Sequence, residues 1–288
     1  MRLVHLTDPH LSSLDDVRMA ELRGKRWSGY LSWRKNRRKR YLPAILEELT
    51  AAVRAEAADQ ILVTGDLVHI GLEAEIKQAA GWLSSLGPAE QVMLVPGNHD
   101  YYVAESSALF NHAWSDYLFL KGKDRTFPVL RKFGGVSLVG LSSARATPVF
   151  MASGRLGDAQ LDATRVVLEQ AADEGQMVVV LIHHPPLPGM TSSRKALADA
   201  HNLRNLLEQY PPALVMHGHL HHNREQLWGE TRVCCTAAAS SIADASYRVI
   251  DIEESGADRT LRMVLKSVEI NERGELSFAK VDEQTWQI

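Results

Sequence analysis

The sequence predicts an α/β fold with a largely parallel sheet, because short apolar runs alternate along the chain with longer amphipathic segments. Six apolar runs have the length of buried strands, at residues 2–6, 60–63, 91–95, 136–141, 177–182 and 213–216. Four stretches between them have helical periodicity, at residues 42–57, 73–86, 158–172 and 202–209. Asp158 directly follows a glycine, and an acidic residue is typical of the first turn of a helix.

The C-terminal part of the chain has a different pattern. Residues 247–252, 261–270 and 276–281 are typical of strands, and turn signals separate them at Ser255-Gly256 and at 271–274. This pattern predicts a closing antiparallel meander. We find no internal repeat and no linker-like composition, so we expect residues 1–288 to form a single domain, with a basic, aromatic insertion at about residues 20–45.

The composition excludes several classes of protein. A net charge of −3 gives no global electrostatic basis for binding nucleic acid. The two cysteines, Cys234 and Cys235, are adjacent, so they cannot form a disulfide framework and indicate a reducing environment. The first apolar run is too short for a signal peptide, and no run approaches the roughly 20 apolar residues of a membrane span. We therefore expect a cytoplasmic protein, with peripheral contact to the inner membrane as the alternative.

Five polar blocks follow predicted strands and carry side chains that bind metals. The blocks are Asp8-Pro9-His10, Gly65-Asp66, Gly97-Asn98-His99-Asp100, His183-His184-Pro185-Pro186 and Gly218-His219-Leu220-His221. Each block alone is typical of a turn or loop. Because each comes at the carboxyl end of a strand, where α/β folds place their active sites, we expect all five to converge. Their coincidence predicts a dinuclear metal centre and hydrolytic chemistry.

The blocks supply seven candidate ligands for two divalent metal ions. Asp66 is the natural bridging ligand, because its carboxylate can give one oxygen to each cation. The full set is Asp8, His10, Asp66, Asn98, His183, His219 and His221. Oxygen and nitrogen ligands without thiolate fit manganese, iron or zinc, and do not choose among them.

These motifs, in this order, resemble the calcineurin-like metallophosphoesterase superfamily. The resemblance implies a four-layer sandwich of two mixed sheets, face to face, with helices outside. It also implies that Asp8, His10, Asp66 and His221 hold one metal, while Asp66, Asn98, His183 and His219 hold the other. Residues 183–188, 154–156 with 160–161, and 247–251 resemble the bacterial cyclic-nucleotide phosphodiesterase branch. Ser142 departs from that branch, which often has Asp after the leucine, and this bears on the substrate.

Two residues next to Asn98 are candidates for catalysis. We expect His99 to stabilise charge on the phosphoryl group or to protonate the leaving group. Asp100 has two readings, as a partner that fixes the tautomer of His99 or as a helix N-cap. The predicted activity is metal-dependent hydrolysis of a small phosphodiester, with a cyclic nucleotide as one candidate. The alternative is a lipid-linked pyrophosphatase of the UDP-diacylglucosamine type, or another phospholipid-directed hydrolase at the membrane surface. A scaffold that has lost its metals is disfavoured, because all seven ligand positions and His99 are intact.

The segment Arg23–Leu42 is the sharpest local anomaly of charge. Between Arg23 and Arg40 it has nine Arg or Lys and no acid, so the segment carries +9 and the rest of the chain carries −12, which gives the net charge of −3. On a continuous helix, Trp27, Tyr30 and Leu31 would share one broad face with Tyr41 and Leu42. Three readings stay open: packing of the aromatic residues on the core, contact with a membrane surface or lipid substrate, and, least favoured, contact with nucleic acid.

Overall fold

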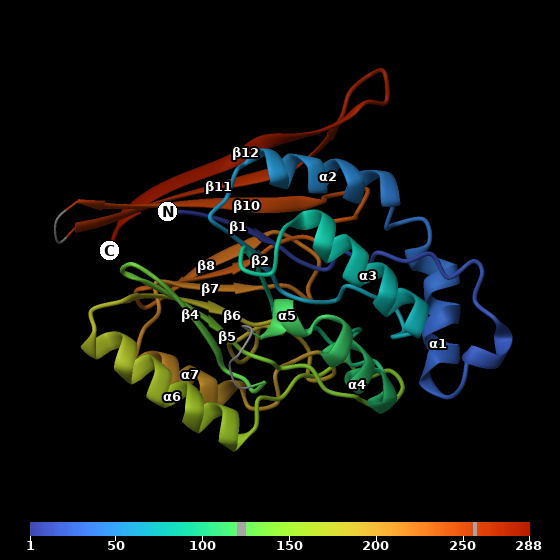
Figure 1. Ribbon diagram of the computed structural model, residues 1–288, viewed down its shortest axis with the longest axis horizontal. Helices are drawn as coiled ribbons and strands as arrows, with labels where there is room; N and C mark the ends of the chain where they lie inside the picture. Colours follow the sequence, from blue (N-terminus) through green and yellow to red (C-terminus); the bar gives the residue numbers. More distant parts are fainter. Residues whose placement is uncertain (120–124, 256–257) are drawn as a thin grey trace.

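Two six-stranded mixed sheets pack face to face, with helices on their outer faces (Figure 1). The computed structural model describes residues 1–119, 125–255 and 258–288. The first sheet has the order β12 (Leu276–Gln287), β11 (Asp258–Ile270), β10 (Ser246–Ser255), β1 (Arg2–Leu6), β2 (Gln60–Val63), β3 (Val92–Leu94). The second has the order β4 (Val129–Phe133), β5 (Val136–Gly140), β6 (Met177–Leu181), β7 (Leu214–His217), β9 (Thr231–Cys235), β8 (Arg224–Trp228). The four-layer fold that the family resemblance implies is confirmed.

Helices cover the two sheets separately. The first sheet carries α2 (Pro43–Ala55) and α3 (Glu73–Leu86), and the second carries α6 (Asp158–Asp173) and α7 (Ala200–Gln209) (Figure 1). Two helices that the sequence did not reveal, α4 (Ala104–Ala113) and α5 (Ser115–Leu118), lie beside α3 and β3. No helix among the described residues is long and apolar enough to cross a membrane.

Strand β6 shows why its sequence is a continuous apolar run. Met177, Val179 and Leu181 point into the core between the sheets. Val178 and Val180 point the other way, into the cluster formed with α6 and α7. A parallel strand that is buried on both faces needs apolar residues at every position, so alternation is lost and only the length of the run marks it as a strand.

The C-terminal meander is present, since β10, β11 and β12 pair antiparallel in sequence. Strand β12 continues to Gln287, beyond the predicted end at residue 281. The sequence did not predict this extension, because the residues of β12 are largely exposed and lack an apolar pattern. The predicted turn at Ser255-Gly256 lies partly outside the described residues, which include Ser255 but not Gly256.

Strands β4, β8 and β9 were not predicted as strands. The division into a single domain stays a prediction.

Parallel pairing brings the ligand blocks to one edge of the sandwich. In the first sheet β1, β2 and β3 are parallel, and in the second β5, β6, β7 and β9 are parallel. Their carboxyl ends therefore lie together, and the segments that follow β1, β2, β3, β6 and β7 carry the five blocks.

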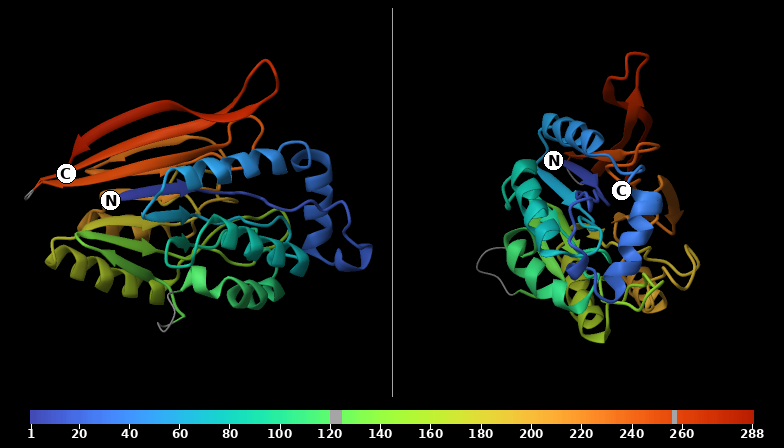
Figure 2. Two further views of the ribbon diagram at one scale, coloured as in Figure 1. Left: turned by 45° about the horizontal axis from the view of Figure 1, so that its top comes forward. Right: turned by 90° about the vertical axis from the view of Figure 1, so that its right-hand side faces the viewer.

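The basic segment is not one continuous helix. The short 3-10 helix Met19–Glu21 precedes it, and the segment itself contains α1 (Lys25–Ser32) and a π-helical turn at Trp33–Arg37, at the end of the molecule opposite the termini (Figure 2). The expectation that Trp27, Tyr30 and Leu31 share one helical face with Tyr41 and Leu42 is wrong, because no helix includes Tyr41 and because Tyr41 is 7% exposed while Trp27 and Leu31 are 41% and 46% exposed. Trp33 is 3% exposed. Trp33 belongs to a small cluster with Leu14, Leu22, Ile70, Leu72 and Tyr102.

We predict that Trp33→Ala loosens this segment. Removing a buried tryptophan costs about 3–5 kcal/mol of packing, so the open form of the segment should become more populated. Trypsin should then cleave between residues 23 and 40 at least about tenfold faster than in the wild type, as measured by mass spectrometry of the fragments. Trp27→Ala, on the exposed side of α1, is the matched control. Equal cleavage of the two variants would show that Trp33 does not anchor the segment.

Candidate metal centre

The five blocks converge on one buried cluster. Ligand atoms of Asp8, His10, Asp66 and His221 lie within 4.8 Å of one another, and those of Asp66, His183 and His219 form a second such group. Asp66 belongs to both, as expected of a bridging carboxylate. The Asn98 amide oxygen lies 3.2 Å from His183 Nε2, which adds it to the second group. Six of the seven side chains are buried and His221 is half-buried.

The backbone of this cluster is strained. Five candidate ligands have positive φ angles, between 42° and 70°: Asp8, His10, Asp66, His219 and His221. Non-glycine residues rarely adopt this region, at a cost of order 1–3 kcal/mol each. Backbone hydrogen bonds hold the first two loops together, from Asp8 N to Gly65 O at 3.0 Å and from His10 N to Asp66 O at 3.2 Å. Strain concentrated on these residues indicates that the loop conformations serve the site.

Asp100 fixes the loops and does not contact the His99 ring. Its carboxylate accepts hydrogen bonds from the backbone N–H groups of Asp66 (2.9 Å), Leu67 (2.8 Å) and Gly97 (2.8 Å). Burial and the nearby charge of Asp66 raise the pKa of Asp100 to about 7. The N-cap reading is wrong, because α4 begins only at Ala104, and the structure does not show the expected contact with the His99 ring. Asp100 instead joins two of the ligand blocks.

Imidazole lone pairs face acceptor atoms across the cluster. His183 Nδ1 donates to the Thr64 carbonyl oxygen at 2.6 Å, so its Nε2 carries a lone pair. That Nε2 lies 3.3 Å from Asp66 Oδ2 and 3.2 Å from Asn98 Oδ1, which are both acceptors. Either a proton on Nε2 or a metal cation between these atoms relieves the repulsion. Although burial opposes it, the Asp66 carboxylate accordingly raises the pKa of His183 to about 9.

Other buried ligand atoms have no hydrogen-bond partner among the described residues. His219 Nε2 and Asp8 Oδ1 are such atoms, although Asp8 Oδ1 lies 2.9 Å from His221 Nε2. His10 Nδ1 donates to the Val68 carbonyl at 3.1 Å, so its Nε2 is also a bare lone pair, 3.4 Å from His221 Nε2. Unpaired buried acceptors are costly. Their convergence fits two divalent cations, and the donor set of carboxylate, amide and imidazole suits borderline metals.

His99 lies at the rim of this cluster. Its backbone N–H donates to Asp66 Oδ1 at 2.7 Å, and its ring Nδ1 donates to the carbonyl oxygen of His69. Its Nε2 then accepts a hydrogen bond from Arg37 Nη1 at 2.9 Å. Burial and the Arg37 charge hold the pKa of His99 well below its usual range.

Three side chains at the site were not predicted from the sequence. Arg37 contacts His99, the Tyr41 hydroxyl lies 2.6 Å from His221 Nδ1, and the His69 ring stacks on His10 with centroids 5.0 Å apart. The basic segment was recognised as an anomaly, but nothing local distinguishes Arg37 from the cations beside it. His5, in contrast, is the core histidine that its place in a strand predicts, with both ring nitrogens 2.9 Å from threonine hydroxyls.

Glycines in the motifs allow the blocks to approach one another. A Cβ at Gly97 would lie 2.2 Å from Asp66 Oδ1, and a Cβ at Gly218 would lie 2.4 Å from Asp8 Oδ2. Both are far below van der Waals contact. Gly97 and Gly218 are therefore required because a carboxylate of another block occupies the space of a side chain.

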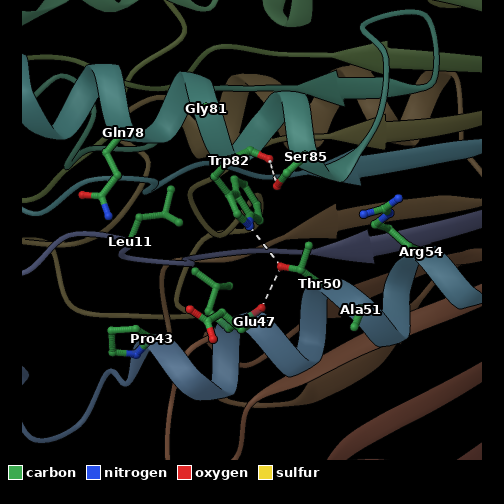
Figure 3. A pocket seen from close by; sticks show the side chains of 11 residues that line it. Leu11, Pro43, Glu47, Thr50, Ala51, Arg54, Gln78, Gly81, Trp82 and Ser85 are labelled. Atoms are coloured by element: carbon green, nitrogen blue, oxygen red, sulfur yellow. Dashed lines mark hydrogen bonds between the residues drawn. The ribbon is translucent and has the colours of Figure 1, made fainter.

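A separate cavity of about 490 Å³ lies between α2 and α3, away from these residues (Figure 3). Among the described residues that line it, Trp82 donates its indole N–H to Thr50 Oγ1 at 3.0 Å, and Gly81 faces open space. It brings together no group of ligands, so the chemistry belongs to the cluster of the five blocks.

A family model described as calcineurin-like phosphoesterase matches residues 1–223. The chain belongs to this family. It is therefore a metal-dependent phosphoesterase, and the Asp and His cluster is the part of the described structure that can hold the family's metals. The resemblance inferred from the motifs is confirmed.

Individual relatives agree with this membership. The chain is 27% identical over 236 residues to a probable cyclic nucleotide phosphodiesterase of Synechococcus sp. (strain WH7803), covering 77% of this chain and 75% of that protein. A dimetal phosphatase from Danio rerio has a TM-score of 0.65 at 15% identity, covering 99% of this chain and 98% of that one. A purple acid phosphatase from yellow lupin seeds (Lupinus luteus) has a TM-score of 0.63 at 14% identity, covering 99% of this chain and 53% of that one. At these identities, both structures show that the fold is shared.

We predict that Gly97→Ala removes metal binding from this phosphoesterase, because the new Cβ displaces the Asp66 carboxylate. Metal content after purification, measured by mass spectrometry, should fall by at least one equivalent per chain. Gly81→Ala is the matched control, since its Cβ meets nothing within 4 Å and alanine stabilises a helix by about 1 kcal/mol. If Gly97→Ala kept its full metal content, the expectation that Asp66 binds both metals would be contradicted.

Proposed function

We propose that the chain is a dinuclear phosphodiesterase that hydrolyses a small phosphodiester, with cyclic nucleotides as the first candidates. The observation that carries this proposal is the set of unpaired lone pairs and carboxylate oxygens converging on Asp66. The printed name of the Synechococcus relative supports the substrate class. A cavity of about 410 Å³ beside Asn98 and His99 has the size of a small-molecule site.

In this proposal Asp8, His10, Asp66 and His221 hold one metal, and Asp66, Asn98, His183 and His219 hold the other. Two bound divalent cations would polarise the phosphoryl group and make a water nucleophilic at neutral pH.

The chain's own residues then supply orientation and charge. Asp100 keeps the Asp66 and Gly97 loops in register, and the Thr64 and Val68 carbonyls hold His183 and His10 with Nε2 toward the cluster. Arg37 and His99 together place a positive charge and a ring nitrogen at the rim, where a phosphoryl oxygen or a leaving group would lie.

A second candidate is hydrolysis of a lipid-linked pyrophosphate at a membrane surface. The observation that favours it is the outer face of α1, where Trp27 and Leu31 are exposed four residues apart. Exposed Arg23, Arg34 and Lys35 lie in the same segment. Interfacial aromatic residues with basic neighbours suit anionic lipid.

The first test is hydrolysis of bis-p-nitrophenyl phosphate with added manganese. Asn98→Ala should reduce kcat/KM by at least about 100-fold, because the loss of a direct ligand should cost no less than the loss of an outer-shell partner. A chelator should abolish the activity of the wild type, and added metal should restore it. Asn202→Ala, on the exposed face of α7, is the control and should keep full activity. Wild-type turnover that persists without metal would exclude the dinuclear mechanism.

Flotation with vesicles tests the second candidate. The wild type should float with vesicles that contain anionic phospholipid, and the double variant Trp27→Ser, Leu31→Ser should lose this binding by at least about tenfold. Val166→Ser is the control, because it removes an exposed apolar side chain from α6, outside the basic segment. This variant should bind the vesicles as the wild type does. A wild-type protein that stays free of these vesicles would eliminate the membrane reading.

A further inference from the structure

The cavity beside Asn98 and His99 is lined by four cations and, among the described residues, by no carboxylate. Lys25 and Arg37 come from the basic segment, and Arg194 and Lys195 come from the loop after β6. The two pairs are far apart in sequence, so the positive charge of the cavity is a result of folding. The cavity measures about 410 Å³, which is more than one phosphoryl group fills.

Lys25 is held in this cavity without a carboxylate. Its Nζ lies 2.7 Å from Thr147 Oγ1, 3.3 Å from the Met151 carbonyl oxygen and 4.5 Å from the centroid of the Tyr102 ring. None of these groups carries a negative charge. Partial burial lowers the pKa of Lys25 to about 8, although the charge of Asp66 raises it, so the ammonium is still largely protonated at neutral pH. A half-buried cation with no carboxylate in direct contact favours an anionic ligand, which would offset the cost of its partial burial.

Arg37 is unpaired in the same way. Its guanidinium makes its side-chain hydrogen bonds to the His99 ring, and no carboxylate of the described chain lies within 4.0 Å of it. Arg38, the next residue, points outward and pairs with Asp15 at 2.9 Å. The outward Arg38 is therefore neutralised by a carboxylate, whereas the inward Lys25 and Arg37 have no carboxylate in contact among the described residues.

We propose that this cavity binds a second phosphoryl group of the substrate while the scissile phosphoester lies at the metals. Among the phosphodiesters of the proposed function, and for the pyrophosphates of the second candidate, this favours a substrate with a further phosphate over a cyclic mononucleotide, whose single phosphate at the metals would leave the four cations unpaired. An arginine fork and lysine point charges are the usual partners of phosphate oxygens. This inference rests on the proposed function, because it places the second group relative to the proposed reaction.

A pair of dinucleotides tests the cavity. The adenosine dinucleotide pApA carries a 5′-phosphate, and ApA lacks it. The two compounds have the same scissile diester and differ by one phosphoryl group. The wild type should prefer pApA in kcat/KM by at least about tenfold, mainly through KM. Lys25→Met should bring this ratio to within about twofold of one, and Lys25→Arg should keep most of it. Lys195→Met, at an exposed position, should lower the ratio as well, and serves if Lys25→Met does not fold.

Lys39→Met is the matched control, because Lys39 is an exposed lysine of the same segment outside the cavity. Its ratio should equal that of the wild type. Equal kcat/KM for pApA and ApA in a wild type that hydrolyses bis-p-nitrophenyl phosphate would overturn the inference and leave the proposed function intact. A ratio unaffected by Lys25→Met and Lys195→Met, or lowered equally by Lys39→Met, would overturn it too. No turnover of any of the three diesters by the metal-loaded protein would reject the proposed function itself.

Discussion

Repulsion between ligand atoms at Asp66 is the constraint on which the rest of the site depends. Its carboxylate lies between two groups of lone pairs, and no hydrogen bond within the described chain neutralises them all. Such a cluster forms only if the surrounding structure holds each ligand in place. The Thr64 and Val68 carbonyls fix two histidine tautomers, and Asp100 fixes the loop of Asp66 itself. Pre-organisation of this kind leaves the binding energy of the cations available for chemistry.

The sandwich supplies the rigidity that the strained loops require. Five ligand residues with positive φ would relax in an isolated peptide, at a gain of about 1–3 kcal/mol each. Here these loops follow strands that are buried at nearly every residue, and hydrogen bonds join the two sheets' loops, as from His219 N to Asp8 Oδ2 at 3.0 Å and from Ala239 N to Thr7 O at 2.9 Å. The packing of the core thus holds the strained loops in the conformations that bring the ligand side chains together.

Local pattern was sufficient to predict the strands that precede the five blocks and to single out the seven candidate ligands, because each block follows an apolar run, but it missed β4, β8 and β9. It failed where a contact depends on the path of the chain. Arg37 reaches His99 across 62 residues and Tyr41 reaches His221 across 180. Arg37 ends a π-helical turn at Trp33–Arg37, and the sequence pattern does not reveal this turn. Asp100 was misassigned because adjacency to His99 says nothing about backbone amides of another loop.

The basic segment and the metal cluster are best understood as one electrostatic system. Outside residues 23–40 the chain carries −12, so an anionic substrate would meet a repulsive molecule without the segment's nine positive charges. Trp33 anchors the segment by its packing, α1 carries Lys25 to one wall of the cavity, and the turn that follows carries Arg37 to His99. The outward cations can attract an anion to the mouth, but they are screened by solvent and salt. The inward pair is half-buried and is screened less, and it lines the cavity where the proposal places the second phosphate, so selectivity among phosphoesters should arise more from Lys25 and Arg37 than from the segment's total charge.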